Sequence, residues 1–397
     1  MFQDHVPKQA VFMGLLAAFV GYASSFAVVL QGLRAVGATE LQAVSGLTAL
    51  TLAMGLCGVL MSWWTRMPAS IAWSTPGAAL LVASQGTGVD FHSAIGGFLI
   101  CAVMLVITGL IRPLGRLVSA IPGSLAAAML AGVLFSLCLA PMVALGEDPL
   151  AAGLIIVAWF IGGRLHRFAA VPAALGAFIV IVLTGLAAAD PSAADPTETI
   201  PSGFGLFLTP LMPQFDLGSV LGIALPLFIV NMASQNIPGM AVLVSNGYKP
   251  NAGRLFTWTG VFSLGAAPFG GHAVNMAAIT AALCAGEDVD PNPARRWWAA
   301  ATAGVAYCVI AFFVGPFIAF VSLAPPILIA AVAGLALIGS FTGAITGAFA
   351  DPDEREAAGI TFLVTASGFA VFGIGSAFWG LLAGGLLLFA IKAKKGL

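Results

Sequence analysis

Charged residues are scarce in this sequence. Only 8% of its 397 residues are Asp, Glu, Lys or Arg and 60% are hydrophobic, whereas soluble domains carry about 25% charged residues. The mean hydropathy is +1.04. A chain with so little charge is typical of a polytopic membrane protein, so we expect it to lie in a lipid bilayer.

Several kinds of chemical site are also missing. There is no CxxC pair, no HExxH and no Walker loop, so the sequence indicates no metal, no other cofactor and no ATP hydrolysis. The apolar stretches hold no acid–base pair or nucleophile set, which argues against an enzyme with catalytic residues, and the lack of basic patches argues against nucleic-acid binding. The cysteines have no paired spacing and are interpreted as small buried hydrophobic residues: Cys57, Cys101, Cys138, Cys284 and Cys308.

Acidic residues are absent from the interior of the apolar stretches. All sixteen Asp and Glu fall in tails, in connecting segments or, for Glu356, at the very end of an apolar segment. A carboxylate within the membrane is costly and usually functional, and many cation-coupled transporters hold one. Because such a group would repel an anion, its absence favours an anionic substrate, held by backbone N–H groups at the positive ends of helices.

The apolar residues themselves divide into fourteen segments. The third and tenth are too short for a bilayer crossing, which takes about 20 residues. The Pro-, Asp- and Ser-rich loop 190–216 separates two sets of seven, so we predict an all-α membrane protein with 14 transmembrane segments, a 7+7 inverted repeat and half-helices at segments 3 and 10. The segments are 9–33, 41–64, 74–86, 92–111, 119–141, 149–163, 168–189, 217–246, 254–267, 275–285, 295–322, 325–349, 356–372 and 375–391.

The basic residues predict the orientation of these segments. If the N-terminus is cytoplasmic, fourteen of the fifteen Lys and Arg fall on the cytoplasmic side and only Arg34 falls outside. Both termini are then cytoplasmic. The first apolar run is too long for the h-region of a signal peptide, so no cleavable signal is expected.

The two short segments resemble each other. Pro68–Leu81 and Pro268–Ala282 each combine an extended stretch with a short apolar helix, and aligning their first prolines places Thr75 opposite Asn275. Interrupted segments at matching places in two repeats are typical of a transporter's binding site near the middle of the membrane.

Their polar residues predict helix caps. Thr75 is expected to cap the first half-helix, with Pro76 at the first helical position, and Asn275 to cap a second half-helix beginning at Met276. Two opposed N-termini would present backbone donors from Thr75 to Gly77 and from Asn275 to Met276 to a carboxylate. The alternatives are an ordinary helix cap and, around Gly270-Gly271-His272, an ordinary loop.

The eighth segment carries Asn231, Ser234, Gln235 and Asn236 in an otherwise apolar helix. Asn231 and Gln235 are four residues apart and are expected to share one helix face. Four polar residues in six favour a binding site over helix association. The first segment, its repeat mate, contributes Tyr22, for which helix packing is an equal alternative.

His272 is the one histidine outside a loop or tail. Because imidazole titrates near neutral pH, His272 is a candidate for carrying a coupling proton. The alternative is a neutral hydrogen-bonding role that shapes the polar segment.

Three stretches carry a family resemblance over essentially the whole chain. Gly14–Gln31, Trp73–Gly77 and Gly270–Asn275 resemble the bacterial benzoate:proton symporter family, which is similar in architecture to nucleobase–cation symporters and sulfate transporters. The resemblance implies a core domain (residues 1–116 and 217–323) and a gate domain (residues 117–216, including the external loop, and 324–397).

The chain departs from the nucleobase transporters at three positions. Val274 stands where they have a glutamate, and Asn231 and Gln235 stand where they have Glu and His. These departures remove negative charge, which suits a carboxylate substrate better than a nucleobase.

The resemblance implies a secondary active transporter of the bacterial inner membrane that imports benzoate or a related aromatic carboxylate with a proton by alternating access. A homodimer through the gate domain fits this architecture. The alternatives are a carrier of another anion or a nucleobase on the same fold, and a passive anion channel. The predicted substrate-binding residues are Tyr22, Ser74, Thr75, Gly77, Asn231, Ser234, Gln235, His272, Asn275 and Met276.

Overall fold

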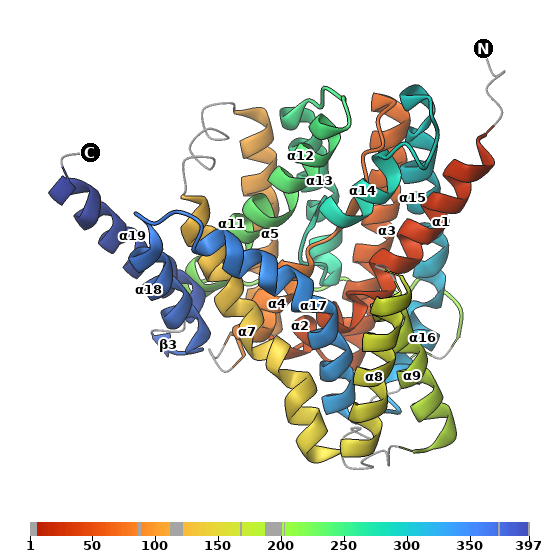
Figure 1. Ribbon diagram of the computed structural model, residues 1–397, viewed down its shortest axis with the longest axis horizontal. Helices are drawn as coiled ribbons and strands as arrows, with labels where there is room; N and C mark the ends of the chain where they lie inside the picture. The colour runs from red at the N-terminus through yellow and green to blue at the C-terminus, as the bar shows by residue number, and fades with distance from the viewer. Residues whose placement is uncertain are drawn as a thin grey trace.

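The computed structural model describes residues 6–85, 89–111, 122–166, 169–186, 201, 203–371 and 374–395 (Figure 1). Within these ranges the chain is mostly helical, as the hydropathy pattern predicted. The start of the fifth expected segment, Arg112, Arg116, Arg167 and much of the loop after the seventh segment lie outside the described residues.

The first half of the described chain consists of helices of different lengths and one short strand. These elements are α1 (Lys8–Ala23), α2 (Phe26–Ala35), α3 (Glu40–Thr65), β1 (Ile71–Trp73), α4 (Thr75–Ala83), α5 (Phe91–Leu110), α7 (Gly123–Glu147), α8 (Pro149–Leu165) and α9 (Ala170–Thr184).

The second half contains π-helical and 3₁₀ turns as well as α-helices and short strands. These elements are α10 (Leu217–Ser219), the π-helical turn η1 (Val220–Ala224), α11 (Leu225–Asn231), the π-helical turn η2 (Met232–Asn236), α12 (Ile237–Ser245), α13 (Ala252–Ala266), the 3₁₀ turn η3 (Ala267–Phe269), β2 (Val274–Met276), α14 (Ala278–Ala285), the 3₁₀ turn η4 (Pro293–Arg295), α15 (Trp297–Ile310), the 3₁₀ turn η5 (Ala311–Phe313), α16 (Val314–Val321), α17 (Pro326–Ala348), α18 (Arg355–Ala366), β3 (Ala370–Val371), β4 (Ile374–Gly375) and α19 (Ser376–Lys395).

Eight helical stretches in the described part of the chain are long and apolar enough to cross a membrane. Two further apolar helices, α8 and α9, are shorter. The long stretches are Lys8–Ala35, Glu40–Thr65, Phe91–Leu110, Gly123–Glu147, Leu217–Ser245, Pro293–Val321, Pro326–Ala348 and Ser376–Ala393.

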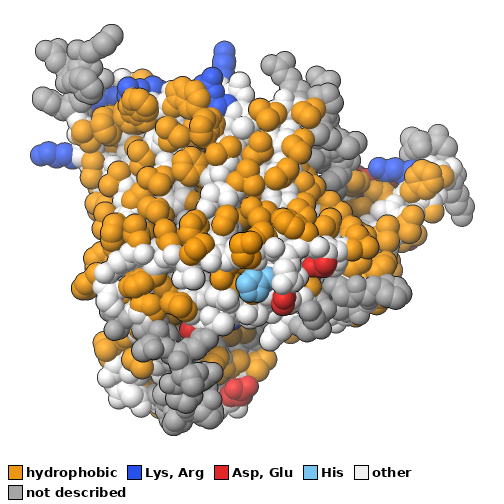
Figure 2. All heavy atoms as spheres, turned by 180° about the vertical axis from the view of Figure 1, so that it is seen from behind, with side chains coloured by type: hydrophobic (Ala, Val, Ile, Leu, Met, Phe, Trp, Pro, Cys, Tyr) orange, Lys and Arg blue, Asp and Glu red, His pale blue; other side chains and the backbone are white. Residues whose placement is uncertain are grey.

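The outer surface of the molecule is apolar. Large side chains such as Phe12, Leu165, Leu183 and Phe389 are 60%, 80%, 72% and 75% exposed. Figure 2 shows hydrophobic side chains over most of one face, with the visible Lys and Arg in its upper half and most Asp and Glu in its lower half. Because soluble monomers rarely expose such broad apolar surface, this face is suited to lipid.

The helices pack in two groups. One group contains α7, α8, α9, α17, α18 and α19, in which α17 packs along α7 and α18 packs against both α7 and α19. The other group contains the remaining helices, with α15 against α3 and α1, and α13 against α5 (Figure 1). The groups meet where α2 contacts α17 and α4 contacts α7.

A two-stranded antiparallel sheet lies inside the second group. Ile71 pairs with Met276, Ala72 with Asn275 and Trp73 with Val274. The pairing extends beyond both strands, because Ser74 donates its N–H to Ala273 (3.1 Å) and Ala277 donates its N–H to Ser70 (3.0 Å). Each strand leads directly into a short helix, α4 after β1 and α14 after β2, and the antiparallel pairing makes these helices leave the sheet in opposite directions.

Candidate functional site

The cap of α4 is Ser74. Its hydroxyl accepts a hydrogen bond from the N–H of Gly77 at 2.9 Å. The prediction that Thr75 is the cap was wrong: Thr75 is the first helical residue and Pro76 the second. Both hydroxyl residues precede the Pro-Gly pair, but the pairing of β1 with β2 keeps Ser74 in the extended conformation that a cap requires.

The prediction of a half-helix capped by Asn275 and starting at Met276 was also wrong. Asn275 and Met276 belong to β2, and α14 begins at Ala278 after Ala277, which has no capping side chain. Pairing with β1 satisfies the extended backbone here and delays the helix. The strands end at residues 73 and 276 and the helices begin at 75 and 278, so Thr75 corresponds to Ala278 and not to Asn275.

The polar residues of the eighth segment lie in and beside the π-helical turn η2. Asn236 accepts a hydrogen bond from the N–H of Met276 (3.0 Å), and Asn231 accepts one from the side chain of Asn275 (3.4 Å). Asn231, Asn236 and Asn275 are all fully buried. These bonds join η2 and the end of α11 to β2.

Asn231 and Gln235 do not share one face, in contrast to the prediction. Asn231 points to β2 and to the Cys101 sulfur (3.7 Å), whereas Gln235 is partly exposed and lines a cavity. The π-helical turn between them has more residues per turn than an α-helix and so changes which side chains align. Turns of this kind occur often at functional sites.

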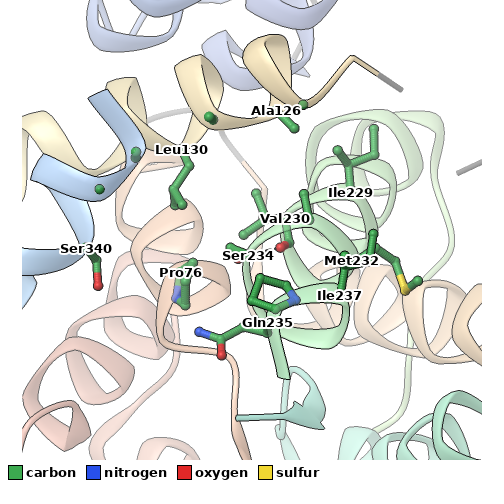
Figure 3. A pocket seen from close by; sticks show the side chains of 16 residues that line it. Pro76, Ala126, Leu130, Ile229, Val230, Met232, Ser234, Gln235, Ile237 and Ser340 are labelled. Carbon is green, nitrogen blue, oxygen red and sulfur yellow. Dashed lines mark hydrogen bonds between the residues drawn. The ribbon is translucent and has the colours of Figure 1, made fainter. Parts of the chain in front are cut away.

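The cavity lies between the two groups of helices and has a volume of about 570 Å³. Figure 3 shows Pro76, Ser234 and Gln235 on one side and α7 and α17 on the other. A volume of this size falls within the range of about 300–1,000 Å³ found for small-molecule sites. The lining residues are Pro76, Gly123, Ala126, Ala127, Leu130, Ile229, Val230, Met232, Ala233, Ser234, Gln235, Ile237, Pro238, Ser340, Gly343 and Ala344.

Among the described residues the lining is apolar apart from three side chains, those of Ser234, Gln235 and Ser340, and none of these lining residues is charged. Ser234 donates its hydroxyl to the carbonyl of Val230, one turn earlier. The amide of Gln235 has no hydrogen-bond partner among the described residues. A cavity of this kind suits a small apolar molecule with few polar groups.

His272 is not among the lining residues of this cavity and lies beside Ser74, the cap of α4. Its ring is fully buried, with Nε2 at 2.9 Å from the Ser74 carbonyl. Because a carbonyl oxygen only accepts, Nε2 carries a proton, and Nδ1 is left without a partner in the described structure. The Phe98 ring packs against the imidazole edge-to-face, with the centroids 6.2 Å apart. His272 therefore links the segment just before β2 to the cap of α4.

Tyr22 supports the sheet and does not line the cavity. Its ring packs on Trp73 of β1, with the centroids 4.9 Å apart. Trp73 in turn donates its indole N–H to Ser25 (2.8 Å). Of the two alternatives for the first segment, the structure favours packing for Tyr22.

The predicted residues thus fall into two layers. Ser234 and Gln235 line the cavity and Thr75 adjoins its lining residue Pro76, whereas Ser74, Asn231, His272, Asn275 and Met276 form the buried hydrogen-bonded layer behind. Gly77 donates its N–H to the capping hydroxyl of Ser74.

Sequence reasoning missed two roles. Asn236 appears in the sequence as one of four polar residues, but its bond to Met276 depends on the fold. Ser340 lies in an apolar segment, and nothing in the sequence distinguishes it from the other hydroxyl residues there, Thr342 and Thr346. Among the described residues no three His, Cys, Asp or Glu side chains come together as a metal site requires.

Comparison with known proteins assigns the chain to a family. The family described as "Benzoate membrane transport protein" matches residues 4–390. The inner membrane protein YdcO of Escherichia coli (strain K12) is 38% identical over 96% of this chain and 95% of its own length. The benzoate membrane transport protein of Acinetobacter baylyi is 29% identical over 97% of this chain and 96% of its own length.

Solved structures share the fold. The transmembrane domain of the cyanobacterial bicarbonate transporter BicA superposes with a TM-score of 0.64 at 15% identity, over 95% of this chain and 97% of that one. The murine anion transporter Slc26a9, in its inward-facing state, superposes with a TM-score of 0.61 at 14% identity, over 99% of this chain and 69% of that one. The chain belongs to the benzoate membrane transport protein family of membrane transporters.

Proposed function

We propose that this protein is a secondary active transporter that imports benzoate or a related aromatic carboxylate together with a proton. The observation that carries the proposal is the cavity of about 570 Å³ between the N-terminus of α4 and the helices α7 and α17, whose described lining residues carry no charge. The Acinetobacter relative, by its name a benzoate transporter, supports the choice of substrate.

The proposal includes an architecture of fourteen membrane segments in a 7+7 inverted repeat, with the half-helices α4 and α14. Support comes from the two strand–helix units, which pair antiparallel and leave the sheet in opposite directions. We assign residues 1–116 and 217–323 to a core domain and residues 117–216 and 324–397 to a gate domain, because helices of these two sets pack mainly within their own set.

In this proposal the substrate carboxylate binds at the start of α4. The positive end of the helix attracts an anion, and the donor there that has no partner among the described residues is the N–H of Thr75, because Pro76 has no N–H and that of Gly77 is taken by Ser74. Thr75 is partly exposed and adjoins the cavity-lining Pro76. The amide of Gln235 adds a second donor, and the aliphatic lining would surround the ring.

We propose His272 as the proton carrier. Its Nδ1 is buried without a partner, so a proton gained there would change the charge of the layer that holds the cap of α4. Protonation could thereby alter the position of the helix terminus that receives the carboxylate.

The proposed location is the bacterial inner membrane, with both termini cytoplasmic. The name of the Escherichia coli relative supports the membrane, and the separation of basic from acidic side chains in Figure 2 supports the orientation. The cavity is lined by the start of α7 and the later part of α17, so in this orientation it lies in the cytoplasmic half. We also propose a homodimer through the gate domain.

The test is uptake of labelled benzoate into proteoliposomes, with and without an inward proton gradient, in competition with salicylate, sulfate and uracil. Gradient-stimulated uptake that only salicylate blocks is the expected result. Competition by sulfate or uracil, or no benzoate uptake, would contradict the proposed substrate.

A second assay separates a carrier from a passive anion channel. Proteoliposomes are loaded with unlabelled benzoate and the transient accumulation of labelled benzoate is followed. Alternating access predicts counterflow, in which the internal ligand drives labelled uptake, and a channel would give none.

A further inference from the structure

Ser340 is the single polar side chain that α17 contributes to the cavity. Its hydroxyl has no hydrogen-bond partner among the described residues. Hydroxyl side chains in helices usually donate to the carbonyl one turn earlier, as Thr342 and Thr346 do on the same helix, to Ile338 (3.0 Å) and to Thr342 (2.9 Å). Ser340 therefore keeps its donor and acceptor available to a molecule in the cavity.

The cavity offers more room and more polarity than benzoate needs. Its volume of about 570 Å³ lies in the range that holds drug-sized ligands, whereas benzoate is a single ring with a carboxylate. Once the carboxylate is held at α4 and Gln235, the rest of an unsubstituted ring has no polar group to offer to Ser340.

Ser340 and Gln235 lie on different walls of the cavity. Gln235 belongs to η2 beside Pro76, and Ser340 comes from α17, which packs along α7 (Figure 3). A rigid ring with polar groups at two positions could contact both walls at once. Because the described residues of the lining include no cation, the second polar group should be neutral, since a second carboxylate would lie uncompensated among them.

We propose, building on the proposed function, that Ser340 is a specificity-determining residue that hydrogen-bonds a hydroxyl group on the substrate ring. The preferred substrate class is then a hydroxylated aromatic monocarboxylate. Its carboxylate lies at the start of α4 and its hydroxyl group lies at α17.

The test is calorimetric titration of the purified protein with benzoate, with 2-, 3- and 4-hydroxybenzoate, and with the dicarboxylate phthalate. At least one hydroxybenzoate should bind about 3- to 10-fold more tightly than benzoate, the gain typical of one neutral hydrogen bond. Ser340→Ala should remove this advantage, whereas Ser340→Thr, which keeps a hydroxyl, should retain part of it.

Thr342→Ala is the matched control, because it removes a hydroxyl from the same helix at an exposed position outside the cavity lining. Thr342→Ala should leave the ratio of hydroxybenzoate affinity to benzoate affinity as in the wild type. The inference would be overturned if benzoate and all three hydroxybenzoates bound equally tightly, or if the advantage of a hydroxybenzoate survived Ser340→Ala. Binding of phthalate more tightly than the hydroxybenzoates would also overturn it.

The same measurements distinguish this inference from the proposed function. Discrimination that depends on Ser340, without gradient-stimulated uptake, would contradict proton-coupled transport and leave the specificity inference standing. Benzoate uptake without such discrimination would contradict the inference alone. Binding of none of these acids would overturn both.

Discussion

Asn236 makes the hydrogen bond that ties η2 to β2, from its carbonyl oxygen to the N–H of Met276 at 3.0 Å. Asn236→Ala leaves that buried N–H without an acceptor, which costs about 1–3 kcal/mol. We expect a lower unfolding temperature in detergent and a loss of benzoate uptake, because η2 also carries the cavity residues Ser234 and Gln235.

A matched control is Asn246→Ala, which removes an amide that bonds the Val242 carbonyl at 2.9 Å near the end of α12. This residue is remote from β2 in the chain and does not line the cavity. Uptake should be retained. Equal effects of the two substitutions on uptake would contradict a special role for Asn236.

His272 allows its hydrogen-bonding role to be separated from its proposed proton role. The side-chain amide in His272→Gln can replace the Nε2 donor to the Ser74 carbonyl, but it cannot take up a proton near neutral pH. We expect His272→Gln to keep counterflow and to lose stimulation by a proton gradient, and His272→Ala to lose both. Full gradient stimulation in His272→Gln would show that the proton is carried elsewhere.

The residue types of the site could be predicted, but not their partners. The sequence indicated Ser74, Thr75, Asn231, Gln235, His272 and Asn275, because polar residues in apolar segments are costly without a function. The capping role of Ser74 and the bond from Met276 to Asn236 depend on the β1–β2 pairing, which joins residues about 200 positions apart. Local patterns contain no information about such a pairing.

At the scale of elements, α7 and α17 cross closely at Gly334. A Cβ at this position would fall on the backbone carbonyl oxygen of Leu137, and a backbone atom cannot move aside as a side chain can. Gly334→Ala should therefore push the two helices apart and lower the unfolding temperature, measured in detergent.

Gly339→Ala on the same helix is the control, since nothing lies within 4 Å of its added Cβ. Alanine in a helix is favoured over glycine by about 0.5–1 kcal/mol, so Gly339→Ala should raise the unfolding temperature slightly. If the two substitutions change the unfolding temperature in opposite directions, the close crossing of α7 and α17 is the cause of the destabilisation by Gly334→Ala. A change in the same direction would contradict this explanation.

Glu354 joins three elements of the proposed gate domain. It accepts a hydrogen bond from Ser124 near the start of α7 and an ion pair from Lys392 of α19 at 3.0 Å. The Ser124 hydrogen bond, followed by the contact with Lys392, lowers the pKa of the Glu354 carboxyl below its usual value near 4.5.

A lowered pKa in the folded state gives stability above the pKa of the unfolded chain, and this stability is lost as the pH falls through the folded value. The unfolding temperature of the wild type should therefore fall more than that of Glu354→Gln when the pH is lowered from about 6 to about 4. Glu356→Gln, at an exposed position on α18, is the control and should follow the wild type. A parallel fall in all three proteins would contradict the role of Glu354.

The elements were predicted with unequal success for physical reasons. Long apolar runs predicted α3, α5 and α17 to within one or two residues of their bounds, because hydropathy reports the lipid-facing surface directly. The three-residue strands were expected only as extended segments, and the π-helical turns η1 and η2 were not expected, because each depends on contacts between distant segments.

At the scale of the whole molecule, the proposed mechanism requires the core domain to move against the gate domain. The cavity separates them, with Ala233 of η2 on one wall and Ala127 of α7 on the other. Cysteines at these two positions, in a background lacking the five native cysteines, can be joined by a short reducible cross-linker. Replacing alanine by cysteine changes the volume little, so uptake before cross-linking should be near that of the parent.

Cross-linking residues 127 and 233 should stop uptake, and reduction should restore it, because the ligand can reach both sides only if the two walls move relative to each other. The control pair, Glu354→Cys with Lys392→Cys, joins residues within the gate domain whose side chains are 3.0 Å apart in the native protein. A cross-link there constrains no motion between domains and should leave uptake unchanged. Uptake that persists with 127 and 233 joined would contradict motion at this interface, and uptake abolished by both cross-links would place essential motion inside the gate domain.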